Sequence, residues 1–382
     1  MLYVVNVGWF FVSHRLALAT SAVALGDEVH VAATLQGPLD SHTRGILAAA
    51  GISFHELHFS RSGSSPFEFA RNVAELGCLF RRVKPDIVHL ITLKPVLLGG
   101  IVSRFMGIKA IVLAIPGRGS VFSAQGALSK LRRWLVASSY RLAYGTRTRV
   151  IVQNAEDGDY FVRQGIFKSQ HVRLIRGSGV DLSRFEFRPE PAGKPVVVLA
   201  SRMLKEKGVE DFVGAAMELK RSGQDARFVL VGEPDPGNPG SLTRAELAAW
   251  ADSGAVEWWG FRPDMETVFA ESHLVCLPTF YGEGVPKVLI EAAAVGRAIV
   301  TTDIPGCRDI VQDGVNGLLV PPRNAQRLAS ALGSLLSDPI RRREMGIQGA
   351  RRAKKEFDVR IVVDETLRLY SELGDRSSAK RP

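Results

Sequence analysis

The sequence predicts an α/β protein built from two doubly wound parallel sheets. Short runs rich in Val and Ile alternate with helix-length segments, this alternation occurs in two series, and three prolines and one glycine within residues 188–195 separate the series. The 382 residues, of which 46% are hydrophobic and 23% charged, provide enough chain for two globular domains. We expect domains over 1–185 and 186–355, followed by a C-terminal helix and tail over 356–382.

The first series starts at the N-terminus. Its apolar runs predict strands that are buried on both faces, as in parallel sheets covered by helices. No basic residue precedes the apolar N-terminal stretch, which favours a core strand ending near Asn6 and Gly8 over a secretory signal. Helices are expected over 13–25 and 66–82. The expected strands are residues 2–7, 29–33, 53–57, 87–90, 110–114 and 149–152.

The second series repeats this pattern after the proline-rich connector. A charged helical segment then covers 339–357, an amphipathic segment covers 359–373, and a frayed tail is expected over 374–382. The expected strands are residues 196–200, 227–231, 256–259, 274–277, 298–301 and 318–320.

The net charge of +10 is distributed unevenly along the chain. Residues 1–182 contain 21 basic and 11 acidic side chains, whereas the remainder contains 28 of each. No acidic residue occurs between Asp86 and Glu156. An anionic partner is therefore expected on the first domain.

The three cysteines are scattered and form no CxxC pair, which fits a reducing compartment and indicates neither a disulfide framework nor a thiolate metal site. Arg104 and Lys109 interrupt the most hydrophobic stretch, so any membrane contact is expected to be peripheral.

Chemistry is expected in the loops that follow the strands, because open parallel sheets bind ligands at the carboxyl ends of their strands. After strand 196–200, Arg202, Lys205 and Lys207 stand just ahead of a helix. Cations beside helix N–H groups suit a diphosphate. On these residues alone, a solvated basic loop is an equal alternative.

A second loop follows strand 274–277. Glu283 stands between two glycines, and Glu291 lies further along in a helix that looks buried. Both carboxylates face one ligand only if the turn is tight, which Gly282 and Gly284 permit. A carboxylate that accepts from two ribose hydroxyls is a natural role for Glu291, and an ordinary helix glutamate is the alternative.

These motifs, in this order, resemble a known family. They are similar to motifs of the retaining nucleotide-sugar glycosyltransferases of family 4, and the likeness extends over nearly the whole chain. The matching parts are the Arg202 to Gly208 segment, the Gly-Glu at 232–233, the pair Glu283 and Glu291, and the later segments at 296–302 and 313–320. This resemblance implies the GT-B fold: two Rossmann-like domains facing across a cleft, with the C-terminal helix crossing back to the first domain.

The resemblance also implies roles for individual residues. Arg202 and Lys207 would bind the donor diphosphate, Glu291 the ribose hydroxyls and Glu283 the transferred sugar. The remaining donor-site residues would be Gly260, which borders the base, with Gly284 and Val285.

The first domain resembles one subgroup of this family more narrowly. That subgroup extends polyprenyl-diphosphate-linked saccharides in the assembly of bacterial glycoproteins or surface polysaccharides such as lipopolysaccharide O-antigen. The matching segments are 10–15, 91–95, 152–157 and 175–181. The donor implied is a UDP-sugar, commonly an N-acetylhexosamine. Arg118 stands in the region where many members have a histidine, so it is a candidate for acceptor phosphate or donor diphosphate. His14 is a weaker candidate near the reacting carbon, with a packing or capping role as the alternative.

Two further expectations follow for mechanism and cofactors. Retention without an evident enzymic nucleophile favours front-face attack assisted by a leaving-group oxygen, with Glu283 orienting the sugar. No Asp-x-Asp occurs in a metal-binding context, and Arg202 and Lys207 can stabilise the leaving diphosphate, so no cofactor and no metal ion are expected.

An anionic membrane surface is the expected partner of the basic first domain, since the acceptor implied is a lipid. Four residues of one predicted helix suit that surface: Lys130, Arg132, Arg133 and Trp134. An ordinary amphipathic surface helix is the alternative. We expect a cytoplasmic protein at the cytoplasmic face of the inner membrane.

Other functions remain open from the sequence. Nucleic-acid binding is disfavoured, because no zinc-finger or RRM signature is present. A UDP-N-acetylhexosamine 2-epimerase is the alternative enzyme, and a non-catalytic sugar- or lipid-binding subunit is the alternative outside enzymes.

Overall fold

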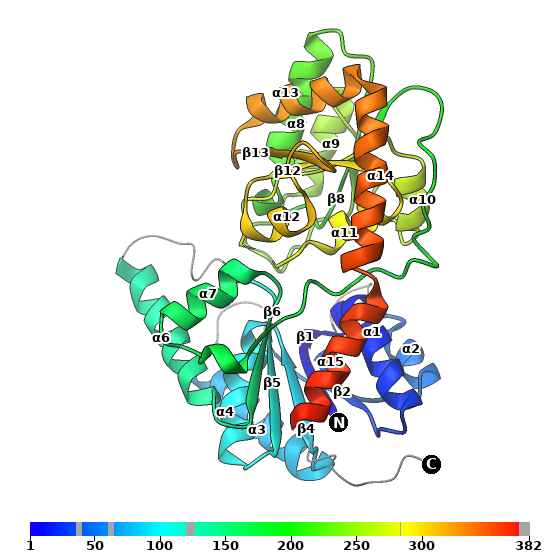
Figure 1. Cartoon of the computed structure of the whole chain (residues 1–382). Coiled ribbons are helices and arrows are strands. Elements are labelled where there is room, and N and C mark those ends of the chain that lie inside the picture. Colours follow the sequence, from blue (N-terminus) through cyan, green and yellow to red (C-terminus); the bar gives the residue numbers. More distant parts are fainter. Residues whose placement is uncertain (36–39, 60–64, 120–126, 283, 374–382) are drawn as a thin grey trace. The chain divides into compact units, whose positions relative to one another are not determined.

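The computed structural model describes residues 1–35, 40–59, 65–119, 127–282 and 284–373, and it divides into two compact units (Figure 1). Unit 1 comprises Met1–Ser178 and Val359–Pro382, and unit 2 comprises Gly179–Asp358. The boundary between the first segment of unit 1 and unit 2 lies after Ser178, earlier in the chain than the expected domain boundary at residue 185. The reason is that Val180 donates its N–H to the Phe357 carbonyl at 2.8 Å, and Phe185 packs on Phe269 inside unit 2.

Within the described residues, unit 1 has a seven-stranded parallel sheet in the order β3-β2-β1-β4-β5-β6-β7. The six strands expected from the sequence are present, and the short outer strand β7 is additional. The strands are β1 (Leu2–Val7), β2 (His30–Thr34), β3 (Ser53–Glu56), β4 (Ile87–Ile91), β5 (Ala110–Ile115), β6 (Thr148–Val152) and β7 (Val172–Leu174).

Helices cover both faces of this sheet because the strands are apolar on both sides. Phe11, Leu47 and Tyr370 enter the core of one face, which is covered by α1 (Gly8–Ala24), α2 (Thr43–Ala49) and α15 (Val359–Leu373). The other face is covered by α3 (Pro66–Val83), α4 (Gly100–Phe105), α6 (Ala127–Ala143) and α7 (Ala155–Arg163), with the short helix η2 (Pro95–Gly99). The short helix η3 (Ser169–His171) directly precedes β7.

Helix α1 starts directly after β1, so the expected start at residue 13 was wrong. The Trp9 N–H donates to Oδ1 of Asp40 at 2.6 Å, which satisfies one donor of the helix N-terminus. A Cβ on Gly8 would lie 2.8 Å from the same oxygen, so glycine allows this close approach.

Unit 2 has, in its described part, a six-stranded parallel sheet in the order β10-β9-β8-β11-β12-β13. All six expected strands are present. They are β8 (Val196–Ala200), β9 (Arg227–Val231), β10 (Glu257–Trp258), β11 (Leu274–Leu277), β12 (Ala298–Thr302) and β13 (Gly317–Val320).

Two hydrophobic cores, one on each face of this sheet, hold the helices of unit 2 in place. One core includes side chains of α8 (Val209–Arg221), α9 (Arg244–Asp252) and α13 (Ala325–Ser337), and the other includes side chains of α10 (Met265–Ala270), α11 (Lys287–Ala294) and α12 (Pro305–Ile310).

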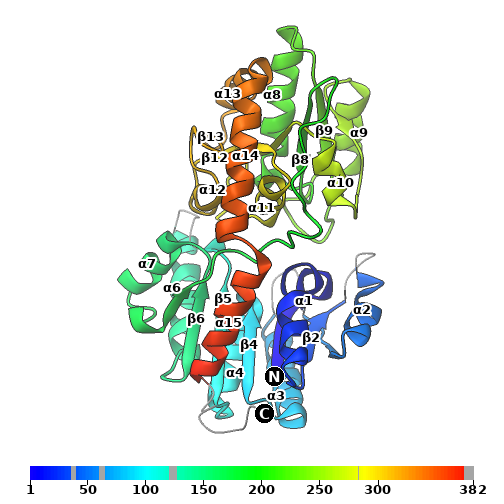
Figure 2. The ribbon, with the colours of Figure 1, turned by 45° about the vertical axis from the view of Figure 1, so that its right-hand side comes forward.

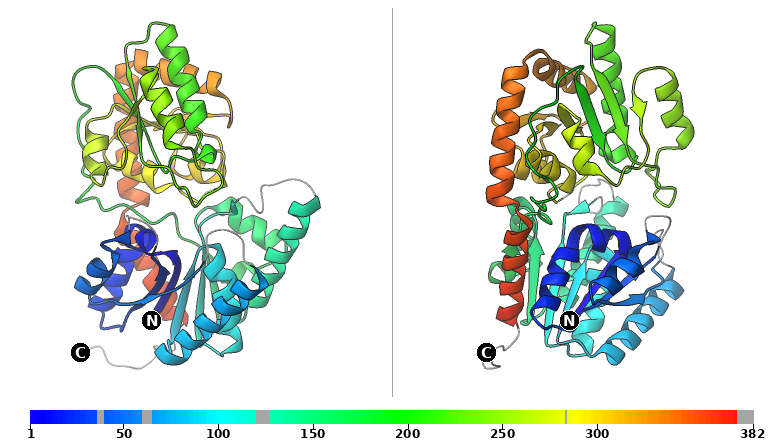
Figure 3. Two further views of the ribbon diagram at one scale, coloured as in Figure 1. Left: turned by 180° about the vertical axis from the view of Figure 1, so that it is seen from behind. Right: turned by 90° about the vertical axis from the view of Figure 1, so that its right-hand side faces the viewer.

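The last two helices connect the units along the chain. Helix α14 (Pro339–Glu356) contributes Met345 and Ala353 to the two cores of unit 2, and the chain then continues into α15 (Figure 3). Helix α15 belongs to unit 1 and lies beside α1 (Figures 1 and 2). The expected return of the C-terminal helix to the first domain is confirmed.

Candidate active site

The loop after β8 positions the first predicted donor-binding residue. Arg202 follows the strand directly, and its Nη1 lies 2.8 Å from Oδ2 of Asp235 in the loop after the neighbouring strand β9. The Asp235 side chain is 9% exposed and that of Arg202 is 40% exposed. One guanidinium has five N–H donors, so Asp235 orients Arg202 and leaves donors for a ligand.

Lys207 ends the short helix η4 (Lys205–Lys207), and Gly208 follows with φ 74°. A Cβ at Gly208 would lie 2.1 Å from the Pro278 carbonyl oxygen, so this position brings the loops after β8 and β11 together. The Glu206 carbonyl accepts from Thr279 Oγ1 at 2.9 Å and from the Phe280 N–H at 3.0 Å. These bonds fix Lys207 near the loop that leads to the predicted carboxylates.

Glu291 lies in α11, where only 9% of the residue is exposed. Lys287 provides the partner that a buried carboxylate needs, with Nζ 3.3 Å from Oε1. Burial raises the pKa of Glu291, and the positive charge of Lys287 opposes that rise. The carboxylate is thus held by Lys287 in the helix that follows β11 at the carboxyl edge of the sheet.

The other predicted donor-site residues surround the same edge. Gly284 and Val285 are buried just ahead of α11, and Pro286 is the residue directly before the helix. The carbonyl of Gly260, in the loop after β10, accepts from the Gly232 N–H at 2.7 Å. Glu283 lies outside the described residues. The described residues of the predicted donor site therefore follow three strands, β8, β10 and β11, of one sheet.

Two neighbours of these residues could not be assigned from the sequence. Asp235 follows the Gly-Glu at 232–233, and its pairing with Arg202 requires that β8 and β9 be adjacent in the sheet. The guanidinium of Arg323 lies 4.3 Å from the Phe280 ring centroid, and no sequence pattern connects these two residues.

In unit 1, Arg118 follows β5 and pairs with Asp157 of α7, with Nε 2.5 Å from Oδ1. The guanidinium carbon lies 5.2 Å from the ring centroid of Tyr160. Asn154 caps α7 and donates through Nδ2 to the other oxygen of Asp157 at 2.9 Å. Burial raises the pKa of Asp157, while the hydrogen bonds from Asn154 and Arg118 oppose the rise.

His14 lies within α1 and not in a loop after β1. Its ring stacks on Phe10 at a centroid distance of 4.1 Å, and Nδ1 lies 3.2 Å from the Phe10 carbonyl oxygen. These contacts fit the packing alternative.

Helix α6 presents apolar and basic side chains to solvent. Lys130 and Arg132 are exposed, as are Leu131, Trp134 and Leu135, whose exposed fractions are between 50% and 62%. Arg133 is half-buried and lies one turn from the buried Ala137. The exposed part of the predicted surface thus consists of Lys130, Arg132 and Trp134, together with Leu131 and Leu135.

The charge asymmetry is sharper between the structural units than between sequence halves. Unit 1 contains 26 basic and 14 acidic residues, a net charge of +12, and unit 2 contains 23 and 25, a net charge of −2. Every helix in the described ranges is too short or too polar to span a bilayer. No three His, Cys, Asp or Glu side chains of those ranges gather in a way that could hold a metal ion.

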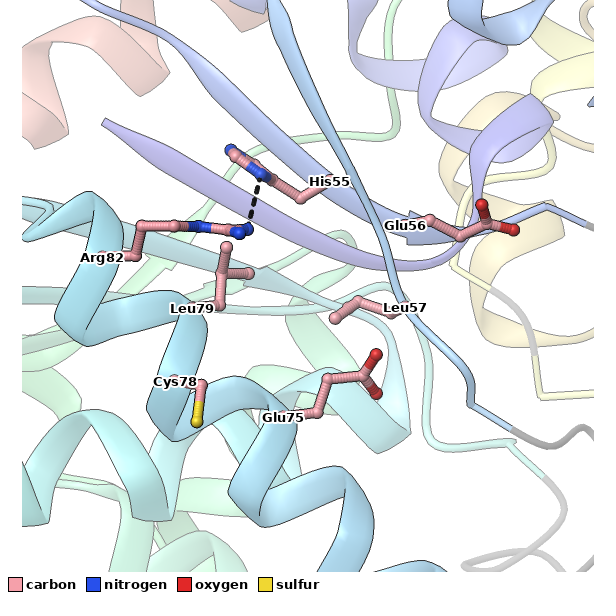
Figure 4. A pocket seen from close by; sticks show the side chains of 7 residues that line it. All are labelled: His55, Glu56, Leu57, Glu75, Cys78, Leu79 and Arg82. Carbon is pink, nitrogen blue, oxygen red and sulfur yellow. Dashed lines mark hydrogen bonds between the residues drawn. The ribbon is translucent and has the colours of Figure 1, made fainter.

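A separate hollow of about 350 Å³ lies between β3 and α3 (Figure 4). Arg82 donates to Nδ1 of His55 at 3.1 Å, and His30 Nδ1 lies 3.1 Å from His55 Nε2, so the polar atoms at one end are paired. β3 is the outer strand of the sheet, and none of the predicted site residues lines this hollow. The lining residues are His55, Glu56, Leu57, Glu75, Cys78, Leu79 and Arg82.

Comparisons with known proteins agree with this geometry. Residues 1–154 match the family described as "Glycosyl transferase 4-like", and residues 194–338 match "Glycosyl transferases group 1". The N,N'-diacetylbacillosaminyl-diphospho-undecaprenol alpha-1,3-N-acetylgalactosaminyltransferase of Campylobacter jejuni is 28% identical over 346 residues, which cover 87% of this chain and 89% of that enzyme.

Two further comparisons concern part of the chain and the fold. The alpha-D-kanosaminyltransferase of Streptomyces kanamyceticus is 29% identical over 181 residues, 47% of this chain and 46% of that enzyme. The crystal structure of Anabaena HepE in complex with UDP and glucose has a TM-score of 0.77 at 19% identity, with 97% of this chain and 98% of that chain covered. The chain is a glycosyltransferase with the GT-B fold, its first part matching the glycosyl transferase 4-like family and its second part the glycosyl transferases group 1 family.

Proposed function

We propose that this glycosyltransferase transfers a sugar, an N-acetylhexosamine or a derivative, from a UDP-sugar to a polyprenyl-diphosphate-linked saccharide, with retention of configuration, in cell-surface glycan assembly. The similarity to the Campylobacter jejuni enzyme carries this proposal, because it extends over 87% of the chain and that enzyme's name specifies both a transferred N-acetylhexosamine and a diphospho-undecaprenol acceptor.

The donor is proposed to bind at the carboxyl edge of unit 2. Arg202, oriented by Asp235, and Lys207 would stabilise the departing diphosphate, whose charge grows as the glycosidic bond breaks. Glu291 would accept from the two ribose hydroxyls. Gly260 would border the base, and Gly284 and Val285 would contact the donor ahead of α11. The complexes of HepE with UDP and glucose support a uridine nucleotide as the ligand of this fold.

Transfer is proposed to proceed on one face of the sugar. An oxygen of the leaving diphosphate would take the proton of the attacking acceptor hydroxyl, and that hydroxyl oxygen would form the new bond on the face from which the diphosphate departs. Glu283 would orient the sugar, and positioning together with charge stabilisation would supply the catalysis.

The acceptor lipid is proposed to bring the protein to a membrane. The net charge of +12 on unit 1 and the exposed Lys130, Arg132 and Trp134 suit an anionic surface. We place the protein in the cytoplasm, peripherally bound at the cytoplasmic face of the inner membrane.

We also propose that transfer requires no divalent ion, since Arg202 and Lys207 supply positive charge to the leaving group. Activity is expected to persist in excess EDTA. A loss that added Mg²⁺ or Mn²⁺ restores would contradict this proposal.

The decisive experiment is a donor screen. A panel of UDP-sugars is incubated with an undecaprenyl-diphosphate-linked saccharide, and both UDP release and the lengthened lipid-linked product are measured. Acceptor-dependent UDP release supports transfer. Conversion of a UDP-N-acetylhexosamine without acceptor would instead identify an epimerase, and Glu291→Gln serves as the donor-site control.

A further inference from the structure

Arg118 is held in one orientation by three side chains of a single segment. Asp157 contacts its Nε, the Tyr160 ring lies beside its guanidinium carbon, and Asn154 holds the second oxygen of Asp157. Asn154 also caps α7 by accepting from the Asp157 N–H at 2.8 Å. Because the cap and the ion pair share Asp157, the orientation of Arg118 is fixed to the start of a helix.

The arrangement is asymmetric in a way that suits a ligand. The Asp157 side chain is 3% exposed, whereas that of Arg118 is 28% exposed. A single carboxylate accepts at most two bonds from one guanidinium, and an arginine has five N–H donors. Asp157 therefore occupies the inner side of the guanidinium, and the outer donors face the solvent at the sheet edge.

The location also favours an anion. Arg118 follows β5 and Asn154 follows β6, and Ile115 and Val152 are register partners, so both loops leave the same carboxyl edge. The neighbouring loop after β4 contains Lys94, and the sequence has no acidic residue between Asp86 and Glu156. No carboxylate from the loops after β4 and β5 can therefore compete with a bound phosphate.

We propose that Asp157 is a positioning residue that holds Arg118 as the phosphate-binding side chain of unit 1, and that this arginine binds the diphosphate of the acceptor lipid. The assignment to the acceptor rests on the proposed function. Because a fork-shaped guanidinium binds two phosphate oxygens at once, its orientation as well as its charge sets the affinity.

Inorganic pyrophosphate is the probe, titrated calorimetrically into the full chain with its donor site saturated by UDP. Arg118→Ala and Asp157→Asn are each expected to weaken pyrophosphate binding about 10-fold, the effect of losing one charge-assisted hydrogen bond. Arg118→Lys retains the charge but not the fork-shaped guanidinium, so its affinity for pyrophosphate is expected to lie between those of the wild type and of Arg118→Ala. Arg44→Ala, which removes a cation paired with Glu56 elsewhere in unit 1, is the matched control and is expected to bind normally.

Asp157→Asn separates positioning from simple attraction. Its removal of a negative charge makes the site more positive, so attraction alone predicts tighter binding, whereas positioning predicts weaker binding. Tyr160→Leu removes the ring and retains the ion pair, and it is expected to weaken binding about 3-fold, which tests the proposal if Asp157→Asn does not fold. Thermal unfolding of every variant identifies those that are folded.

Three results would overturn the proposal. They are unchanged pyrophosphate binding in Arg118→Ala, tighter binding in Asp157→Asn, and an equal loss of UDP affinity in the Arg118 variants, which would assign Arg118 to the donor. The titration needs no turnover. A failure of the donor screen with Arg118-dependent pyrophosphate binding intact would therefore count against the proposed function and not against the phosphate site.

Discussion

The Tyr370 hydroxyl lies 2.5 Å from Nδ1 of His89, although the two residues are 281 positions apart in the chain. The same hydroxyl lies 3.3 Å from that of Tyr3, and all three side chains are buried. Helix α15, which the chain supplies after unit 2, thus provides a hydrogen-bonding group to the core of unit 1. Buried polar groups of this kind need such partners, so α15 is an integral part of the unit.

Replacing Tyr370 by Phe is expected to lower the free energy of unfolding by about 1–3 kcal/mol, because a buried imidazole nitrogen loses its partner while the packing is retained. Denaturant unfolding of the full chain measures this. Glu372→Gln on the same helix removes only an exposed ion pair with Arg173 and is expected to cost less than about 0.5 kcal/mol. Equal stabilities of the two variants would show that the buried bond contributes nothing.

His89 is expected to make unit 1 sensitive to acid. Burial, and secondarily the charge of Arg15, lowers the pKa of His89 well below its usual 6.5, so the folded protein keeps this ring neutral. Below pH 6.5 the unfolded chain binds a proton that the folded chain does not. The free energy of unfolding should therefore fall as the pH decreases from 7 to 5, by up to about 1.4 kcal/mol per pH unit.

The contribution of His89 can be isolated by comparing variants across that pH range. His89→Gln should remove much of the slope. His55→Gln should largely keep it, because His55 is more exposed and the pKa of its ring is lowered less strongly. A wild-type slope that persists in His89→Gln would assign the acid sensitivity to other groups.

Gly208→Ala is expected to damage unit 2 more than a glycine substitution at a similar backbone angle elsewhere. Its φ is 74° and the new Cβ would lie 2.1 Å from the Pro278 carbonyl oxygen, so the loops after β8 and β11 must separate. Gly223→Ala is the matched control, since φ there is 82° with nothing within 4 Å of the new Cβ. The control should cost about 1 kcal/mol and Gly208→Ala several, measured by thermal unfolding. UDP affinity should fall only in Gly208→Ala.

The strand pattern could be predicted from the sequence because apolar runs in parallel sheets report burial directly. All the expected strands are present, whereas α1 starts earlier than expected since Asp40, far from it in sequence, satisfies its N-terminus. The short strand β7 has too few residues to produce a pattern. The local sequence was thus sufficient to predict the strands, whereas a contact with a residue distant in the chain determined where α1 begins.

The predicted site residues differ in how far sequence could place them. Arg202 and Glu291 come after strands that the sequence pattern identified, so the edge of the sheet at which they lie could be predicted. Their partners differ: Lys287 lies one helical turn from Glu291, whereas Asp235 reaches Arg202 only through the order of the strands. The exposure of Arg133 depends on which face of α6 packs inward, and that face is visible only in the structure.

Glu291→Gln is expected to weaken UDP binding about 10-fold, because a neutral amide oxygen accepts less strongly from ribose hydroxyls than a carboxylate does. Calorimetric titration of UDP measures the loss. Glu271→Gln, an exposed carboxylate of the same unit, controls for the change in net charge. If both variants bind UDP alike, Glu291 serves only as the partner of Lys287.

Charge reversal on α6 is expected to release the protein from membranes. The double variant Lys130→Glu and Arg132→Glu turns two exposed cations into anions, and each cation near an anionic surface is worth about 1 kcal/mol, so binding should fall by at least about 10-fold. Cosedimentation with phosphatidylglycerol-containing liposomes at low salt measures it. Lys354→Glu with Lys355→Glu on α14 makes the same change in net charge and should bind like the wild type if α6 is the contact. Equal losses in both variants would mean that net charge alone, and not this helix, drives the binding.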